Sequence, residues 1–135
     1  MEHELIRTIC PYCGTGCGLL LKVTDGTVVA TYPDRNHPVG KGHLCVKGWS
    51  AHEFVHHPDR LTTPLVRKGD GFQEISWDEA ITFAAEKLQE VAAKYGGDAI
   101  GGFSSAKCTN EENYLFQKLI RAGFKTNNVD HCARL

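Results

Sequence analysis

Residues 10–18 read Cys10-Pro11-Tyr12-Cys13-Gly14-Thr15-Gly16-Cys17-Gly18, and a fourth cysteine, Cys45, follows after 27 intervening residues. The three glycines of this loop allow the backbone to curl around a bulky inorganic group, and they leave N–H groups free to point at sulfur atoms. Three cysteines in one tight loop with a distant fourth suit a [4Fe–4S] cluster, because each of its four irons takes one thiolate. We therefore expect one such cluster at the start of the chain, with four ligands: Cys10, Cys13, Cys17 and Cys45.

The alternative for these four cysteines is a structural zinc ion. Zinc sites usually combine two separate pairs of ligands with short internal gaps, whereas Cys45 has no second cysteine close to it. The two remaining cysteines, Cys108 and Cys132, have no partner at ligand spacing. We expect each of these two to be a small buried residue.

Lys47 lies two residues beyond Cys45 and allows two interpretations. It is either a solvated surface lysine or a cation beside an anionic cluster. In the second case its charge would raise the reduction potential of the cluster, or the side chain would bridge the cluster to a second cofactor.

Short apolar runs rich in β-branched residues surround the cysteine loop and predict three strands, at residues 5–9, 19–23 and 28–32. Asp25-Gly26 separates the last two runs and predicts a hairpin, because both central residues of a type I′ turn need φ > 0. Residues 49–57 read as a short helix that Pro58 stops. We therefore expect residues 1–60 to form a small β-rich domain that binds the cluster.

The pattern changes from residue 61 onward. A second hairpin is expected over residues 65–75, and Ser76 with Glu79 then forms a capping box in front of a helix that Gly96-Gly97 ends. Beyond this helix the sequence predicts a strand, a polar loop, a helix and a second strand, at residues 98–103, 104–110, 111–123 and 126–130.

This order of elements is typical of the opening of an α/β domain with parallel strands. We expect an α+β chain, in which residues 61–135 form the first βαβ-like part of an incomplete α/β domain. Two strands and two helices cannot cover both faces of a parallel sheet, so this part should need more protein to be stable.

Polar residues at the carboxyl end of the predicted 98–103 strand form a second candidate site. Ligands of α/β sheets bind at this end of the strands, and the start of the following helix would suit a phosphate group together with the Lys107 side chain. The alternative is an ordinary capped loop. The candidate binding residues are Ser104, Ser105, Lys107 and Asn110.

Composition and charge argue against several other classes of function. The chain of 135 residues carries 15 basic and 16 acidic residues, a net charge of −1 that does not favour nucleic acid or an anionic membrane as the partner. Its apolar runs fall short of the roughly 18 residues needed to cross a bilayer, and its start lacks a secretion or twin-arginine signal. We expect a cytoplasmic protein with no membrane span, whose six cysteines are reduced.

Taken together, these motifs resemble the N-terminal part of the molybdopterin (bis-guanine dinucleotide) oxidoreductases, and specifically of the formate dehydrogenase catalytic subunits. The cysteine loop and the run Gly42-His43-Leu44-Cys45-Val46-Lys47-Gly48 are shared across that superfamily, and residues 60–65 and 76–80 also match. The runs more specific to formate dehydrogenases are Cys108-Thr109-Asn110-Glu111-Glu112-Asn113 and Asn127-Asn128-Val129-Asp130-His131-Cys132-Ala133-Arg134.

The resemblance implies a role for each candidate residue. The four cysteines would bind the cluster, Lys47 would help electrons pass between the cluster and the proximal pterin, and the loop from Ser104 to Asn110 would face the pterin. Formate would be oxidised to CO₂, or CO₂ reduced, at molybdenum or tungsten held by bis-molybdopterin guanine dinucleotide. Electrons would leave through the cluster to an iron–sulfur or flavin subunit. The alternative function is a non-catalytic iron–sulfur electron-transfer module of a larger redox complex.

In the family that this chain resembles, the residue directly after Cys-Ala-Arg-Leu (or Val) is the cysteine or selenocysteine that binds the metal. The printed chain ends at Leu135, so the resemblance implies that this ligand and the remainder of the catalytic subunit lie beyond it. We interpret the boundary as a selenocysteine codon read as a stop, the alternative being a truncation for other reasons. The 135 residues alone are expected to be inactive towards formate.

Overall fold

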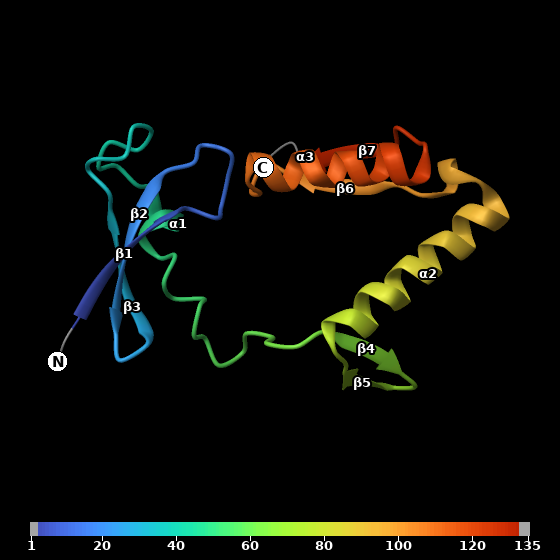
Figure 1. Ribbon diagram of the computed structural model, residues 1–135, viewed down its shortest axis with the longest axis horizontal. Helices are drawn as coiled ribbons and strands as arrows, with labels where there is room; N and C mark the ends of the chain where they lie inside the picture. The colour runs from blue at the N-terminus through green and yellow to red at the C-terminus, as the bar shows by residue number, and fades with distance from the viewer. Residues whose placement is uncertain (1–2, 133–135) are drawn as a thin grey trace. The chain divides into compact units, whose positions relative to one another are not determined.

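The computed structural model of the chain describes residues 3–132 (Figure 1). These residues form two compact units. The first unit contains residues 3–60 together with 105–113 and 132, and the second contains residues 61–104 and 114–131. The short loop 105–113 is therefore packed with the cysteine-bearing part of the chain, although it lies far from it in sequence. The division of the chain into domains at residues 1–60 and 61–135 stays a prediction.

The first unit is built on a three-stranded antiparallel sheet in the order β1-β2-β3 (Figure 1). The strands are β1 (His3–Ile9), β2 (Gly18–Thr24) and β3 (Thr27–Pro33). Asp25 and Gly26 have φ values of 49° and 77°, as a type I′ turn requires. The predicted strands and the predicted hairpin turn are thus confirmed.

The chain after this sheet contains a shorter helix than expected, α1 (Val46–Trp49), followed by successive turns. The predicted helix at 49–57 is wrong. Two histidines of these turns contact β3: His52 Nδ1 lies 3.2 Å from the hydroxyl of the buried Thr31, and the backbone N–H of Val28 donates to His56 Nε2 at 3.0 Å. The backbone closes these turns with hydrogen bonds to the residue three positions back, as from the Glu53 N–H to the Ser50 carbonyl at 3.1 Å, and not four positions back as in an α-helix.

The second unit begins with a two-stranded hairpin, β4 (Leu65–Lys68) and β5 (Gly71–Glu74), which leads into the long helix α2 (Trp77–Tyr95). Ser76 caps α2 through its hydroxyl, which accepts from the Glu79 N–H at 3.2 Å, while the Glu79 carboxylate accepts from the Ser76 N–H at 2.8 Å. The helix ends at Gly96, where φ is 86°. The second hairpin, the capping box and the glycine stop are therefore confirmed.

The remaining elements are a 3₁₀ turn η1 (Gly97–Ala99), β6 (Gly102–Ser105), α3 (Asn110–Lys118), a π-helical turn η2 (Leu119–Gly123) and β7 (Val129–Cys132). The strand predicted at residues 98–103 was placed too early in the sequence, since β6 begins at Gly102. Asp98 is held in a turn instead, since its carboxylate accepts from the hydroxyl of the buried Thr126 and its carbonyl accepts from Asn128 Nδ2 at 2.9 Å. Ser104 and Ser105, expected in the following loop, therefore lie in β6.

β6 and β7 form a two-stranded sheet and run in the same direction. The Gly102 N–H donates to the Asn128 carbonyl at 2.8 Å, and Ser105 Oγ lies 3.2 Å from Cys132 Sγ, so residue numbers rise together along both strands. Parallel strands joined by α3 make the expected βαβ pattern. The mixed α+β fold class is thereby confirmed, and within residues 3–132 no helix has the length and apolar character of a membrane span.

Candidate metal centre

The cysteine loop is the connection between β1 and β2. β1 ends at Ile9 and β2 begins at Gly18, and the Cys10 N–H donates to the Cys17 carbonyl at 2.9 Å, which closes the loop at its base. Cys45 comes from a second segment, as the residue directly before α1. The sheet and α1 together therefore determine where all four cysteines lie.

The four thiols lie close enough to act on one another electrostatically. Burial is the main cause that raises the pKa of the Cys10 thiol; the Tyr12 N–H opposes it, and the charges of Cys13, Cys17 and Cys45 raise this pKa further. Like charges have this effect only at short range. The structure thus brings together the four cysteines that the sequence singled out, from segments that are 27 residues apart.

Two of these thiols lie in surroundings that favour the thiolate. The pKa of Cys13 is lowered chiefly by the Thr15 hydroxyl, which lies 3.4 Å from Cys13 Sγ, then by the Thr15 backbone N–H, and also by the charge of Lys47. The pKa of Cys45 is lowered by the N–H groups of Gly48 and Lys47 and by the Lys47 ammonium, although none of these N–H groups reaches the geometry of a helix-cap hydrogen bond. Thiolates are the form of cysteine that binds metals.

The separation of the thiols bears on the kind of metal group that they could hold. Among residues 3–132, no three His, Cys, Asp or Glu side chains converge on a position for a single metal ion. A structural zinc needs all of its sulfur ligands at about 2.3 Å from one point, whereas the cysteines of a cubane each bind a different iron. The assignment of a cluster therefore rests on the cysteine spacing, three in one loop and a distant fourth.

An apolar layer lies beneath the cysteine loop. Leu19 is 1% exposed and forms a small core with Cys10 and Ala51, against which Tyr12 and Leu44 also pack. The ring of Tyr12 meets the ring of Phe54 edge to face, with the ring centroids 5.9 Å apart. Low polarity around a cluster is one of the properties by which a protein sets its reduction potential.

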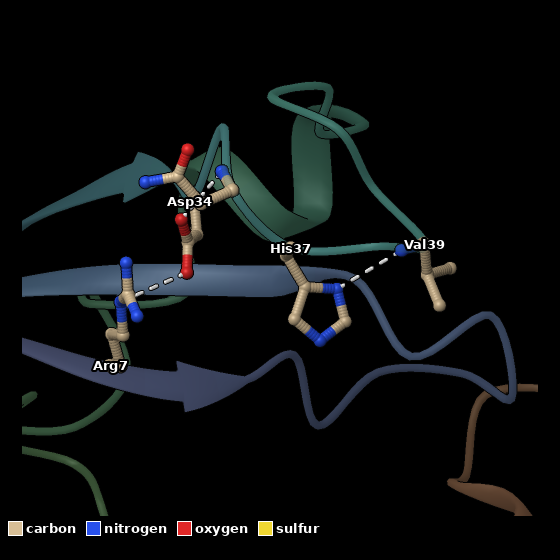
Figure 2. Close-up of polar contacts among 5 residues, drawn as sticks. Arg7, Asp34, His37 and Val39 are labelled. Atoms are coloured by element: carbon tan, nitrogen blue, oxygen red, sulfur yellow. Dashed lines mark hydrogen bonds and ion pairs between the residues drawn. The ribbon is translucent and has the colours of Figure 1, made fainter.

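The loop after β3 packs against the start of β2, next to the cysteine loop. The backbone N–H of Asp34 donates to the Gly18 carbonyl at 3.1 Å, and the ring of His37 covers Gly18 so closely that a side chain there would overlap it. Figure 2 shows that the His37 ring also accepts from the Val39 N–H, at 3.4 Å. Gly18 is thus held from two sides directly after the third cysteine.

The first residue of α3, Asn110, contacts the cysteine loop. Asn110 Nδ2 donates to the Gly14 carbonyl at 2.9 Å, across 96 positions of sequence. The sequence had suggested Asn110 as a pterin contact and carried no signal for this pairing, because nothing in either segment alone indicates the other.

The other residues proposed for the second candidate site lie close together along β6 and the loop that follows it. Ser105 Oγ accepts from the Lys107 N–H at 3.0 Å and lies 3.2 Å from Cys132 Sγ. Ser104 precedes Ser105 in β6 and belongs to the second unit. Their pterin contacts stay a prediction, as does that of Asn110.

The expectation that Cys108 and Cys132 are buried is wrong for Cys132, which is exposed, while Cys108 is partly buried. Cys132 Sγ is not an apolar packing group here, since it accepts from the Ala106 N–H at 3.3 Å. The residues Ala133, Arg134 and Leu135, which carry the end of the family motif, lie outside the described residues.

Comparison with known proteins assigns both parts of the chain to one family. Residues 4–57 match the model of the molybdopterin oxidoreductase Fe4S4 domain, and residues 60–135 match the model of molybdopterin oxidoreductase. The second match alone covers more than half of the chain.

Close relatives are alpha subunits of formate dehydrogenases. The chain is 58% identical, over its whole length, to the F420-dependent formate dehydrogenase 1 subunit alpha of Methanococcus maripaludis, and 51% identical to the F420-dependent formate dehydrogenase subunit alpha of Methanocaldococcus jannaschii. It spans 19% of the length of each of these curated relatives. Among solved structures, acetylene hydratase from Pelobacter acetylenicus is similar, with a TM-score of 0.71 and 25% sequence identity. The match covers 93% of this chain and 18% of the hydratase chain.

Proposed function

Because this chain belongs to the molybdopterin oxidoreductase family, we propose that Cys10, Cys13, Cys17 and Cys45 bind a [4Fe–4S] cluster within the amino-terminal part of a formate dehydrogenase alpha subunit. The observation that carries the proposal is the meeting of four thiols from two segments, each near enough to Cys10 to act on its charge. The fold by itself does not select formate, since an acetylene hydratase has a similar fold. Formate is supported by the names of the relatives that are more than 50% identical.

The residues around the thiols have separate tasks in this proposal. The cluster would supply a one-electron relay between a molybdenum or tungsten bis-molybdopterin guanine dinucleotide site, where formate and CO₂ interconvert, and an acceptor subunit. The four cysteines would hold it, next to the buried apolar core that Leu19 forms with Cys10 and Ala51. Lys47 places a positive charge beside Cys13 and Cys45, on the path of the electron.

Further elements of the proposal concern the second cofactor and the partners. Ser104, Ser105, Lys107 and Asn110 would lie next to the pterin, which is supported by their place at and beyond the carboxyl end of β6. The acceptor would be an iron–sulfur or flavin subunit, and F420 is supported as the final acceptor by the names of the two methanogen relatives. We place the protein in the cytoplasm, where thiols stay reduced.

The test is whether formate delivers electrons to the cluster. The complete subunit that contains this chain is isolated anaerobically with its pterin cofactor, formate is added, and the reduced cluster is followed by electron paramagnetic resonance and by loss of visible absorbance. We expect reduction by formate as well as by dithionite. Reduction by dithionite but never by formate would contradict the formate dehydrogenase proposal and favour the non-catalytic electron-transfer module.

A lysine variant tests the path of the electron in the same assay. Lys47→Gln should slow reduction by formate severalfold while leaving the extent of reduction by dithionite unchanged. Lys22→Gln, which removes a lysine in the middle of β2, is the matched control and should leave both unchanged. Equal rates in the Lys47 variant and in the native protein would remove Lys47 from the electron path.

A further inference from the structure

The contact between Asn110 and Gly14 is unusually close. Besides the 2.9 Å hydrogen bond from Asn110 Nδ2 to the Gly14 carbonyl, the Asn110 amide lies over the α-carbon of Gly14. A β-carbon added at Gly14 would overlap Asn110 Oδ1 and would lie 3.0 Å from Asn110 Cγ. A side chain at position 14 would therefore require the Asn110 amide to move, so the two residues form one fitted contact.

Asn110 is itself held rigidly at the start of α3. Thr109 and Glu112 form a reciprocal capping box, in which the Thr109 N–H donates to the Glu112 carboxylate at 2.7 Å and the Glu112 N–H donates to Thr109 Oγ1 at 3.2 Å. The Asn113 amide donates to the Ser105 carbonyl at 3.1 Å and accepts from the Ser105 N–H at 3.3 Å. The side chain that reaches Gly14 thus starts from a fixed backbone.

The Gly14 carbonyl belongs to the same peptide group as the N–H of Thr15. A trans peptide is planar, with its C=O and N–H pointing in opposite directions, so holding the oxygen also fixes the direction of the N–H. On the far side of this peptide, Thr15 Oγ1 lies 3.4 Å from Cys13 Sγ.

We propose that Asn110 is a positioning residue for the cluster: by holding the Gly14 carbonyl it fixes the peptide that presents Thr15 to the sulfur of Cys13, and it thereby raises the reduction potential of the cluster. This inference rests on the proposed function, since it requires Cys13 to bind iron. Sulfur bound to iron carries no proton, so Thr15 is then the donor. Hydrogen bonds to cluster sulfurs stabilise the reduced state, which carries the greater negative charge.

The experiment is a redox titration of the cluster in the anaerobically isolated holoprotein, followed by electron paramagnetic resonance. Asn110→Ala should shift the midpoint potential to a more negative value while iron and sulfide content stay at the native level. Asn128→Ala is the matched control, because Asn128 also donates from Nδ2 to a backbone carbonyl, that of Asp98, but within the second unit. This control should leave the potential unchanged.

A double-mutant cycle distinguishes an effect of the Asn110–Gly14 contact on the potential from the effect of a general loosening of the structure. Gly14→Ala alone should push the Asn110 amide away and produce the same negative shift as Asn110→Ala. In the Asn110→Ala background the space is free, so Gly14→Ala should add no further shift. Additive shifts would overturn the inference, because they would mean that the two positions act independently.

The remaining outcomes are equally decisive. A fully loaded Asn110→Ala protein with the native potential would overturn the positioning role and leave the proposed cluster intact. Asn110→Asp is the second variant, for the case in which Asn110→Ala loses its cluster and Gly14→Ala in the same background restores nothing. Aspartate cannot donate to the Gly14 carbonyl. A native potential in Asn110→Asp would then also overturn the positioning role. If the native protein itself holds no iron, the proposed function fails first, and the inference with it.

Discussion

The side chain of Arg7 in β1 reaches the carboxylate of Asp34 beyond β3, with Arg7 Nε 3.2 Å from Asp34 Oδ2, as Figure 2 shows. The Asp34 side chain is only 8% exposed, while that of Arg7 is 67% exposed. The second oxygen of Asp34 accepts from the Asn36 N–H at 2.9 Å. A buried carboxylate is therefore satisfied from both sides, at the point where the backbone of Asp34 holds Gly18 beside the cysteine loop.

Removing Asp34 should destabilise the first unit more than removing Arg7. Asp34→Ala loses both hydrogen-bonding partners at a buried position and should cost about 2–3 kcal/mol of unfolding free energy. Arg7→Ala should cost about 1 kcal/mol, because the arginine is largely solvated and screened. Denaturant unfolding of the holoprotein measures both. Arg7→Lys, which keeps the charge, should fall between Arg7→Ala and the native protein, and an Asp34→Ala variant as stable as the native protein would contradict this account.

The capping box of α2 should make the start of this helix sensitive to acid. The pKa of Glu79 is lowered by the backbone N–H of Ser76 and then by its hydroxyl. A carboxyl whose folded-state pKa is lowered contributes stability above its unfolded pKa, and this contribution disappears as the pH falls through the folded-state value. The first turn of α2 should therefore loosen as the pH falls below about 4.3, the ordinary value for glutamate.

Hydrogen exchange of the amides in the first turn of α2, corrected for the intrinsic effect of pH, measures this loosening. Glu79→Gln should abolish the pH dependence, because glutamine accepts from the Ser76 N–H at every pH. Glu86→Gln, farther along the same helix, is the control and should keep it. The same acid response in the Glu79 variant and in the native protein would place its origin elsewhere.

Gly97 is predicted to tolerate no side chain. A β-carbon there would overlap the backbone carbonyl oxygen of Phe124, which cannot rotate away as a side chain could. Gly97→Ala should cost about 2 kcal/mol or more in unfolding free energy, the range of overpacked sites. Gly71→Ala is the control, since a β-carbon at Gly71 would meet open space. Equal melting temperatures for the two variants would show that the turn after α2 moves freely.

Local signals in the sequence were sufficient for several elements. Asp25-Gly26, Ser76 with Glu79, and Gly96 each specify a turn, a helix start or a helix end through their own backbone preferences, and each acts as expected. The crowding of three cysteines within residues 10–17 also predicts a metal group without any tertiary information. In these places the residues that decide the structure are neighbours in sequence.

The predictions failed where residues far apart in sequence determine the local structure. In the turns after α1, His52 and His56 contact β3, and a helical pattern in the segment itself could not reveal those contacts. The place of Asn110 against Gly14 depends on the loop 105–113 packing with the first unit. Helix α2 shows a further limit, because a capping box predicts where a helix begins but not which of its residues are buried: Ile81 and Trp77 are 62% and 68% exposed.

The most direct test of the central claim is the iron and acid-labile sulfide content of the anaerobically isolated protein and its cysteine variants. The account predicts about four irons and four sulfides per chain. Cys10→Ser, Cys13→Ser, Cys17→Ser and Cys45→Ser should each lower this content or convert the cluster, while Cys108→Ser should keep it in full. One zinc per chain in place of iron, or a full cluster in the Cys45→Ser variant together with its loss in the Cys108→Ser variant, would contradict the assignment of these four cysteines.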